Sequence, residues 1–338
     1  MPSGFASWRE IFFASPTSVL EGGMSSPIVL LILGFIVLGA AGEALLRGAV
    51  TVANQLRVPP LIIGLTIIAF GTSAPELTVS LNAALDGQPD ISIGNVVGSN
   101  IANILLVLGA MAVVSPFFVN QGTLGRDGGF MLAVSFVLLG FGLWGGLPTL
   151  AGALLLAVLA AFTIYIYSAA RSADDQQEAE AGVSENLVPG GLPVGFLVLL
   201  VGLGGIVWGA ELMVDGAVGL ARQFAIPEAV IALSLVAVGT SLPELAVSLV
   251  AAIRGHAGLA VGNIIGSNIS NILLILGATA VLADLPISPT LAMRDMSIMV
   301  AVAWLGLFFM ASDRRMSRRE GAVCLLLYAA YMGFIFSA

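Results

Sequence analysis

The chain has 338 residues, of which 58% are hydrophobic and only 9% are charged. About a quarter of the residues of a soluble domain are charged, so this composition excludes an ordinary soluble protein and indicates a membrane protein. The net charge of −8 without any lysine leaves no basic face for a nucleic acid. The single cysteine, Cys324, excludes an internal disulfide framework and a thiolate metal site.

Ten apolar stretches follow an N-terminal extension of residues 1–26, and each is long enough to cross roughly 30 Å of hydrocarbon as a helix. They cover residues 27–46, 59–85, 91–115, 129–146, 148–170, 192–220, 227–253, 258–283, 295–312 and 320–337. The acidic segment 171–191 between the fifth and sixth stretches is typical of a flexible linker. We therefore expect an all-α, polytopic membrane protein with five helices in 27–170 and five in 192–338.

The two halves of the chain are copies of one another. "GTSAPELTVSLNAAL" at 71–85 returns as "GTSLPELAVSLVAAI" at 239–253, displaced by 168 positions. Residues 64–109 and 232–277 share 26 identities in 46 ungapped positions. Because each copy holds five stretches, an odd number, the second copy enters the membrane from the opposite face, which predicts two inverted repeats.

The arginines predict the orientation of the chain. With the N-terminus outside, nine arginines fall in cytoplasmic loops and three in external ones. Basic residues are enriched in cytoplasmic loops. We expect a multi-pass protein of the cell membrane with both termini outside and the linker 171–191 in the cytoplasm.

The motif "GTSAPE" at 71–76 interrupts a membrane-length apolar stretch. Pro75 cannot donate a hydrogen bond to the carbonyl of Gly71, so we expect a broken helix at this point. Thr72, Glu76 and Ser80 share one helical face, and Ser73 lies one turn before Glu76. Carbonyl, hydroxyl and carboxylate oxygens at this depth form the kind of site that hard cations such as Na⁺ and Ca²⁺ prefer.

The stretch that follows carries a matching polar stripe, and the second copy repeats both elements. Asn95, Ser99 and Asn103 recur at intervals of four residues. Their counterparts, and those of the first motif, are Thr240, Ser241, Pro243, Glu244, Asn263, Ser267 and Asn271. In inverted repeats the two broken helices approach one another, so four polar clusters are expected around one central cavity.

Simpler roles compete with ion binding for some of these residues. Small and amide side chains in membrane helices often serve only close packing and interhelical hydrogen bonding, which leaves Asn95 and Asn263 open between packing and ligation. Glu76 and Glu244 are different, because a carboxylate inside a membrane costs roughly 2.5–3.5 kcal/mol and is functional by default. Glu43 and Glu211 lie nearer the ends of their spans and are interpreted as anchors, paired with arginines such as Arg47 or Arg57.

The motifs "GTSAPE" with "GNVVGSNIAN", and "GTSLPE" with "GNIIGSNISN", resemble the two alpha-repeats of the sodium/calcium exchanger (cation/Ca²⁺ antiporter) superfamily. The resemblance covers almost the whole chain and implies exchange of Ca²⁺ for Na⁺ by alternating access at one central site. It further implies that helices 27–46 and 192–220 slide as a gate. The ion-site positions that it implies are Thr72, Ser73, Glu76, Ser99, Asn103, Thr240, Ser241, Glu244, Ser267 and Asn271, with the carbonyls of Ala69 and Ala237.

The chain departs from this family at one pair of positions. Many members have an aspartate at one of the positions occupied here by Asn103 and Asn271, whereas this chain has asparagine at both. Two carboxylates neutralise one Ca²⁺ or two Na⁺, and a third Na⁺ would make the site net positive. The family's usual stoichiometry and any K⁺ dependence therefore do not carry over directly.

Three other functions fit the sequence less well. Two buried glutamates would also suit a proton/Ca²⁺ antiporter, although the hydroxyl-rich "GTS" elements favour sodium. An intramembrane hydrolase lacks a base near Ser73 or Ser241, since the only histidine, His256, lies in a loop. A cation channel is disfavoured because paired broken helices in inverted halves are typical of alternating access. We expect no enzyme activity and no cofactor, with Ca²⁺, Na⁺ and the lipid bilayer as partners and one chain sufficient for transport.

Overall fold

The computed structural model describes residues 26–119, 122, 124–169, 187–224, 237–312 and 314–337. Residues 1–25 and 170–186 lie outside this part, so the predicted N-terminal extension and most of the predicted linker are not described. The described residues are almost entirely helical, with four strands of two residues each.

The first half of the chain begins with a 30-residue helix that continues ten residues beyond the predicted span. The helical elements of this half are α3 (Pro27–Leu56), α4 (Pro60–Ile63), η1 (Gly64–Ile68), α5 (Ala69–Thr72), α6 (Ala74–Leu85), α7 (Pro89–Ala102), η2 (Asn103–Leu108), α8 (Gly109–Val114), η3 (Leu124–Gly128), α10 (Gly129–Trp144) and α11 (Thr149–Ala169). The elements η1, η2 and η3 are π-helical turns that continue directly into α-helices. The strands are β1 (Phe117–Phe118) and β2 (Gly146–Leu147).

The second half repeats this order of elements. Its helical elements are α13 (Gly191–Gln223), α15 (Ala237–Thr240), α16 (Leu242–Ile253), α17 (Ala257–Ser270), η5 (Asn271–Leu276), α18 (Gly277–Leu282), η6 (Leu291–Met296), α19 (Ser297–Ser312) and α20 (Arg318–Ser337). The strands are β3 (Leu285–Pro286) and β4 (Arg315–Met316). The bounds of α6 and α16 differ by 168 positions, as do those of η2 and η5, which is the displacement found in the sequence.

Seven helices of the described segments are long and apolar enough to cross a membrane, and the bent pair Pro60–Thr72 and Ala74–Leu85 raises the number to eight. Helix α16 is a shorter apolar helix, and residues 225–236 before it lie outside the described part. Helix α20 has 20 residues but starts with Arg318, Arg319 and Glu320. An apolar helix lies in each of the ten predicted stretches, but the count of ten spans is not confirmed.

The short strands connect the two halves of the chain. Strand β1 pairs with β4, and β2 pairs with β3, both antiparallel. In the repeat, β1 corresponds to β3 and β2 corresponds to β4. Each pair therefore joins one corner of the first half to the non-equivalent corner of the second half, as expected where a pseudo-twofold axis relates the halves.

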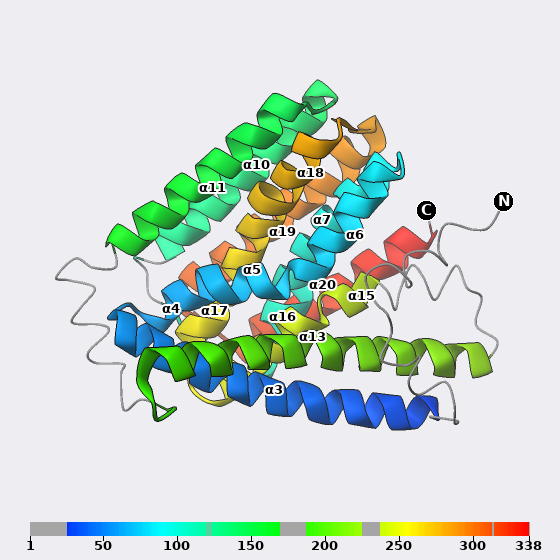
Figure 1. Ribbon diagram of the computed structural model, residues 1–338. Coiled ribbons are helices and arrows are strands. Elements are labelled where there is room, and N and C mark those ends of the chain that lie inside the picture. The colour runs from blue at the N-terminus through cyan, green and yellow to red at the C-terminus, as the bar shows by residue number, and fades with distance from the viewer. Residues whose placement is uncertain are drawn as a thin grey trace.

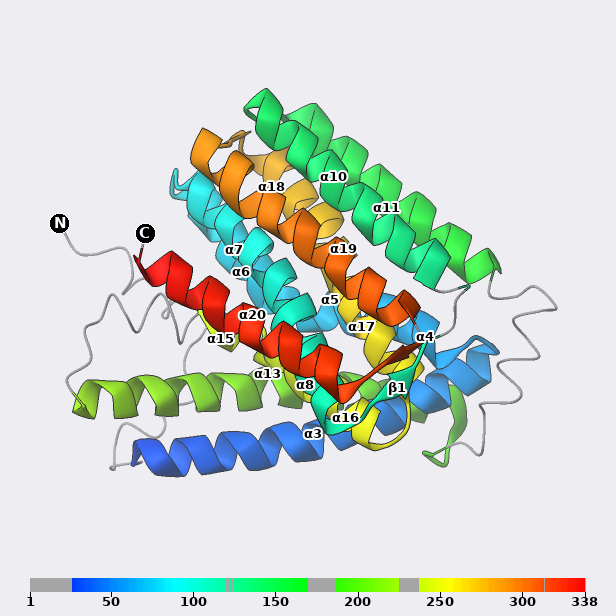
Figure 2. The same ribbon diagram turned by 180° about the vertical axis from the view of Figure 1, so that it is seen from behind.

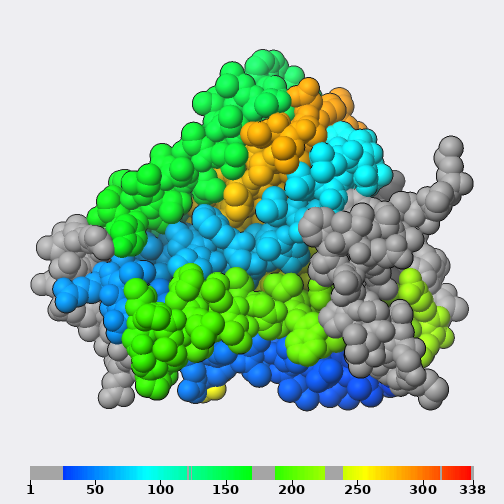
Figure 3. Space-filling model, viewed as in Figure 1, coloured from blue at the N-terminus to red at the C-terminus, as the bar shows by residue number. Residues whose placement is uncertain are grey.

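Helices α3 and α13 pack side by side along one edge of the molecule, and α10 and α11 form the opposite edge (Figures 1 and 2). In Figure 3 the visible atoms of α13 lie directly against those of α3 along this edge. Small residues permit this close approach, because a side chain on Gly202 would collide with the backbone of Leu45. These are the helices that the sequence interpretation expects to move as a gate.

Helices α7 and α17 lie between these two edges and are the most deeply buried of the long helices. Helix α17 packs against α4, η1 and α5, and α7 packs against α6. The polar stripes of the sequence lie on these buried helices, so their side chains are directed into the protein and away from the lipid.

Candidate ion-binding site

The first "GTSAPE" motif breaks its helix as predicted. Helix α5 ends at Thr72 and α6 begins at Ala74, and the two segments are bent by 46° relative to one another. Ser73 between them has φ −82° and ψ 7°, outside the helical region. Pro75 lies in the first turn of α6, where its missing N–H leaves no hydrogen bond unmade within the new helix.

The second copy has the same local geometry. Helix α15 ends at Thr240, Ser241 has φ −87° and ψ 0°, and α16 begins at Leu242 with Pro243 in its first turn. The segment before Ala237 lies outside the described residues, so no bend angle is defined here. The interruption at Ser241 nevertheless agrees with the prediction.

Glu76 and Glu244 lie in the first turns of α6 and α16, and neither side chain is exposed (0% each). The N-terminus of a helix favours a negative charge, which partly compensates the cost of burying each carboxylate. Neither glutamate has an ion pair with a described residue. The two carboxylates are close enough to repel one another electrostatically.

Hydroxyl groups from both halves of the chain surround the two carboxylates. Ser99 of α7 donates to Oε1 of Glu76 at 3.2 Å, and Ser267 of α17 donates to Oε1 of Glu244 at 3.3 Å. Ser73 donates to the same oxygen of Glu244 from the other half, at 3.2 Å. Each carboxylate therefore receives a hydrogen bond from its own repeat, and each also interacts with a hydroxyl of the opposite repeat, Glu244 with Ser73 and Glu76 with Thr240.

The other hydroxyl groups predicted for the site also make contacts between the two halves of the chain. Ser99 and Ser241 lie 3.4 Å apart, and Thr72 and Ser267 lie 3.5 Å apart. The hydroxyl of Thr240 interacts with the Glu76 carboxylate. The structure thus brings both "GTS" elements and both serine positions of the polar stripes to one place.

Several buried polar atoms of this cluster have no hydrogen-bond partner. They are Oε2 of Glu76, Oε2 of Glu244, both side-chain polar atoms of Asn103 and Oδ1 of Asn271. A buried polar atom without a partner costs about 1–3 kcal/mol, so a cluster of four oxygens needs an explanation. A bound cation supplies one, because carboxylate and amide oxygens are suitable ligands for Ca²⁺ and Na⁺.

The two asparagine positions are not equivalent. Asn271 donates from Nδ2 to Oδ1 of Asn100 at 2.9 Å, whereas Asn103 has no side-chain partner. Asn100 also donates to the carbonyl of Asn268 at 3.3 Å. The π-helical turns η2 and η5 begin at Asn103 and Asn271. Such turns are frequent at functional sites.

The resemblance implies two backbone carbonyls as ligands, those of Ala69 and Ala237. The Ala69 carbonyl accepts hydrogen bonds from the Ser73 N–H at 3.1 Å and, more weakly, from the Thr72 hydroxyl at 3.4 Å. These bonds place it beside the break in the helix. Ala237 is the first residue of α15, and its side-chain surroundings lie outside the described part.

Two asparagines left open by sequence reasoning prove to hold the site in position. Asn95 donates to the backbone carbonyl of Glu76 at 3.2 Å and to the hydroxyl of Ser80 at 2.9 Å. Asn263 donates to Ser248 at 3.2 Å, and its Oδ1 accepts from Thr72 at 3.3 Å. The sequence contained a signal for these contacts, because the same residues recur in both repeats: serine at 80 and 248, and asparagine at 95 and 263.

Glu43 forms an ion pair with Arg47, one of the two arginines that the sequence suggested, and a second pair that was not predicted. It pairs with Arg47 at 2.8 Å and with Arg254 at 2.8 Å. Arg57 instead ends α3 in a left-handed conformation, with φ 53°. Glu211 has no arginine partner within the described residues and lies near Asp215, so the paired-anchor interpretation is not supported for it.

A polytopic helical protein with two broken helices and a buried carboxylate–hydroxyl site has the architecture of a secondary ion transporter. The family model described as "Sodium/calcium exchanger protein" matches residues 26–168 and 194–337, one match in each half. The chain belongs to this family, which is a family of transporters, and is therefore a multi-pass membrane antiporter of the sodium/calcium exchanger superfamily.

Individual relatives agree with this assignment over nearly their whole length. The chain is 38% identical to the inner membrane protein YrbG of Escherichia coli, covering 90% of this chain and 94% of YrbG. It is 32% identical to the sodium/calcium exchanger MaX1 of Methanosarcina acetivorans, covering 91% and 98%. The solved structure of the sodium-calcium exchanger NCX_Mj soaked with Na⁺ and Ca²⁺ matches with a TM-score of 0.77 at 32% identity, covering 92% of this chain and 99% of that one.

Proposed function

We propose that this protein exchanges Ca²⁺ for Na⁺ by alternating access, with both ions bound at the site between α6 and α16. The observation that carries the proposal is the pair of fully buried glutamates, Glu76 and Glu244, each with one carboxylate oxygen that lacks a partner. An isolated carboxylate in a low-dielectric interior either binds a cation or takes a proton. The surrounding serine and asparagine oxygens favour the cation.

The charge of the site fits its proposed substrates. Two ionised carboxylates carry −2, which one Ca²⁺ or two Na⁺ ions neutralise. Among the described residues, no group of three or more acidic, histidine or cysteine side chains gathers at any place that could hold a metal. The ligands beyond the two glutamates are therefore neutral oxygens. Whether one Ca²⁺ or several Na⁺ ions occupy the site then depends on how many positive charges the two carboxylates can neutralise.

Alternating access is supported by the relation between the two halves. Five apolar stretches in each half predict inverted repeats, and the strand pairs β1–β4 and β2–β3 join non-equivalent corners of the halves. We propose that ten spans form two inverted five-helix repeats around the site. In such an arrangement, the helices α3 and α13 slide against the rest of the protein to open the site to either face in turn.

Sodium rather than proton coupling is supported by the number of neutral oxygens beside the carboxylates. Ser73, Ser99 and Ser267 all hydrogen-bond to glutamate oxygens, and Na⁺ binds hydroxyl and carboxylate oxygens together. A relative that shares 32% of its residues, MaX1, is named a sodium/calcium exchanger. Proton coupling at the same glutamates is the alternative that the experiment below separates.

The purified chain in proteoliposomes tests the proposal. Uptake of ⁴⁵Ca²⁺ is measured under an outward Na⁺ gradient, a K⁺ gradient of equal size, and a pH gradient without Na⁺. We expect uptake under the Na⁺ gradient only. Uptake that follows the pH gradient at zero Na⁺ would replace the proposal with proton/Ca²⁺ exchange, and uptake that needs no counter-gradient would indicate a channel.

A further inference from the structure

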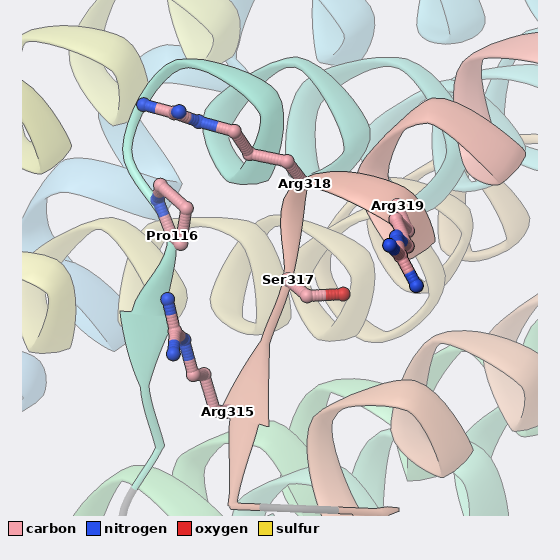
Figure 4. A pocket seen from close by; sticks show the side chains of 5 residues that line it. All are labelled: Pro116, Arg315, Ser317, Arg318 and Arg319. Carbon is pink, nitrogen blue, oxygen red and sulfur yellow. The ribbon is translucent and has the colours of Figure 1, made fainter.

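A basic pocket lies at the corner where β1 meets β4 and α20 begins, away from the ion site. It has a volume of about 620 Å³. Its lining residues are Pro116, Arg315, Ser317, Arg318 and Arg319. Figure 4 shows Arg315 and Arg318 on the side of Pro116, with Ser317 between them and Arg319.

The positive charge of this corner is only partly neutralised by the residues that the structure describes. Arg315, Arg318 and Arg319 are exposed, and none forms an ion pair with a described residue. Glu320 is the nearby acid, and it accepts from the backbone N–H and the hydroxyl of Ser317, both at 2.7 Å, so one negative charge lies beside the pocket. Three arginines therefore line the opening against one carboxylate, which leaves a net positive charge.

Two of the three arginines are held in place by neighbouring groups. Arg318 donates from Nε to the carbonyl of Val113 at 3.1 Å, and Arg315 stacks over the ring of Phe118 at 5.5 Å from its centroid. Both contacts leave the remaining guanidinium N–H groups available. Arginine forks of this kind bind phosphate oxygens in pairs.

An apolar surface continues from the pocket along α20. Phe118, whose ring lies under Arg315, is 73% exposed, and Val323 and Leu326 on α20 are 43% and 71% exposed. On an apolar helix of a membrane protein, exposed side chains of this kind are suited to contact acyl chains. A ligand with a phosphate at one end and hydrocarbon at the other matches both features.

The equivalent corner of the other repeat has the same fold but not the same charge. The pocket beside β2 and β3 has about 410 Å³ and is lined by Trp144, Gly146, Leu147, Pro148, Asp284, Leu285 and Pro286. By the pairing of the strands and the starts of α11 and α20, the positions equivalent to Arg315, Arg318 and Arg319 lie 169 residues earlier, and they are Gly146, Thr149 and Leu150. The arginines are therefore not required by the strand pairing, since the corner forms without them.

We propose that the pocket of Arg315, Arg318 and Arg319 binds the headgroup phosphate of an anionic phospholipid whose acyl chains lie along α20. Basic pockets at membrane helix ends recognise anionic lipid headgroups, and each arginine near the surface adds to the binding. The lipid would hold the start of α20 against α8 on one face of the membrane only, because the opposite corner lacks the charge.

Native mass spectrometry of the purified full-length chain, titrated with phosphatidylglycerol or phosphatidylcholine, tests this proposal. We expect one tightly retained phosphatidylglycerol on the wild type and no matching phosphatidylcholine. The triple variant R315Q/R318Q/R319Q should bind phosphatidylglycerol about a hundredfold more weakly, because three surface charges are lost. The triple lysine variant R315K/R318K/R319K keeps the charge and should retain most of the binding.

Two further measurements show whether the bound phosphate belongs to a lipid or to a free anion, and whether the variants fold. Inorganic phosphate should not displace the retained phosphatidylglycerol; displacement at similar concentrations would indicate a free-anion site and overturn the lipid assignment. Unfolding temperatures measured in phosphatidylcholine alone should agree among the three proteins. If the glutamine variant does not fold, the wild type carries the test, and equal retention of both lipids by the wild type would contradict the proposal.

Discussion

The hydroxyl of Ser73, in the first half of the chain, donates a hydrogen bond of 3.2 Å to Oε1 of Glu244, in the second half. The bond crosses between two helices that are both broken by a proline, so neither half forms the site alone. It also fixes where the unpartnered Oε2 of Glu244 lies relative to the first repeat. The site is therefore sensitive to any movement of one half against the other, as alternating access requires.

Removing this cross-repeat bond should weaken ion binding without removing charge. A hydrogen bond to a charged group contributes about 1.5–3 kcal/mol, so Ser73→Ala should raise the half-saturating Ca²⁺ concentration about tenfold or more. Thr78→Ala is the matched control, because Thr78 only bonds to the carbonyl of Ala74 in its own helix, at 3.0 Å. Equal Ca²⁺ dependence of the two variants in vesicle uptake would exclude a role for Ser73 in the site.

A third carboxylate should be tolerated at one asparagine position better than at the other. Asn103→Asp places new oxygens where the asparagine has no partner, whereas Asn271→Asp replaces a donor that faces Oδ1 of Asn100 at 2.9 Å. Two oxygens would then face each other without a proton or a cation between them. We expect Asn271→Asp to lower the unfolding temperature in ion-free buffer more than Asn103→Asp does.

Both aspartate variants should shift the Na⁺ dependence of Ca²⁺ uptake, since the site would carry up to three negative charges. The measurement is initial uptake as a function of the Na⁺ gradient, with expression controlled. A Na⁺ dependence identical to that of the wild type in both variants would mean that neither position faces the ions.

The interface between α3 and α13 should not accommodate a larger side chain at Gly202 but should accommodate one at Gly204. A side chain at Gly202 meets the backbone of Leu45, while Gly204, two residues along the same helix, has open space around it. Overpacking costs typically 1–3 kcal/mol. Gly202→Leu should lower both stability and Ca²⁺ uptake, and Gly204→Leu should leave both near wild type. Equal loss in the two variants would argue against a close-packed interface that moves.

The topology has its own test, in which a linker cysteine is compared with an external one. Cys324 is buried and can be replaced by alanine to give a background without thiols. In that background, Ala179→Cys should resist an impermeant maleimide on intact cells and react after permeabilisation. Asp86→Cys, in the loop after α6, should react on intact cells. The reverse pattern would invert the orientation.

The sequence predicted the helical architecture and the composition of the site because its strongest signals are chemical. Pro75 and Glu76 in a membrane-length apolar stretch require a broken helix and a partner for the charge, and both features recur 168 residues later. The clustering of Ser73, Ser99, Ser241 and Ser267 then follows from stripes at four-residue spacing. Each of these residues lies at or next to a buried carboxylate in the structure.

Features that depend on packing between distant elements were not predictable in the same way. The π-helical turns that begin at Asn103 and Asn271 arise where buried helices meet, and they leave no sequence pattern. The pairing of Glu43 with Arg254 depends on where α16 ends relative to α3, so the sequence indicated Arg47 as a partner but not Arg254. The unequal surroundings of Asn103 and Asn271 arise between two nearly identical motifs, which sequence alone treats alike.

The Glu43–Arg254 ion pair should contribute little to transport. Both side chains are partly exposed, at 25% and 57%, and an exposed ion pair contributes about 0–1 kcal/mol. Glu43→Gln should therefore keep substantial Ca²⁺ uptake, measured per amount of protein in the vesicles. Uptake abolished by Glu43→Gln would assign this residue a role in the transport cycle beyond anchoring.

Glu43→Gln also serves as the matched control for the central claim, because it makes the same chemical change as Glu76→Gln and Glu244→Gln. Each of the latter two leaves one carboxylate facing a divalent ion, so the site can no longer neutralise Ca²⁺. The most direct measurement is Na⁺-driven ⁴⁵Ca²⁺ uptake into vesicles that contain equal amounts of each inserted variant. We predict that uptake is abolished in both Glu76→Gln and Glu244→Gln and substantial in Glu43→Gln, whereas near-normal uptake by either of the first two would place the transported ion elsewhere.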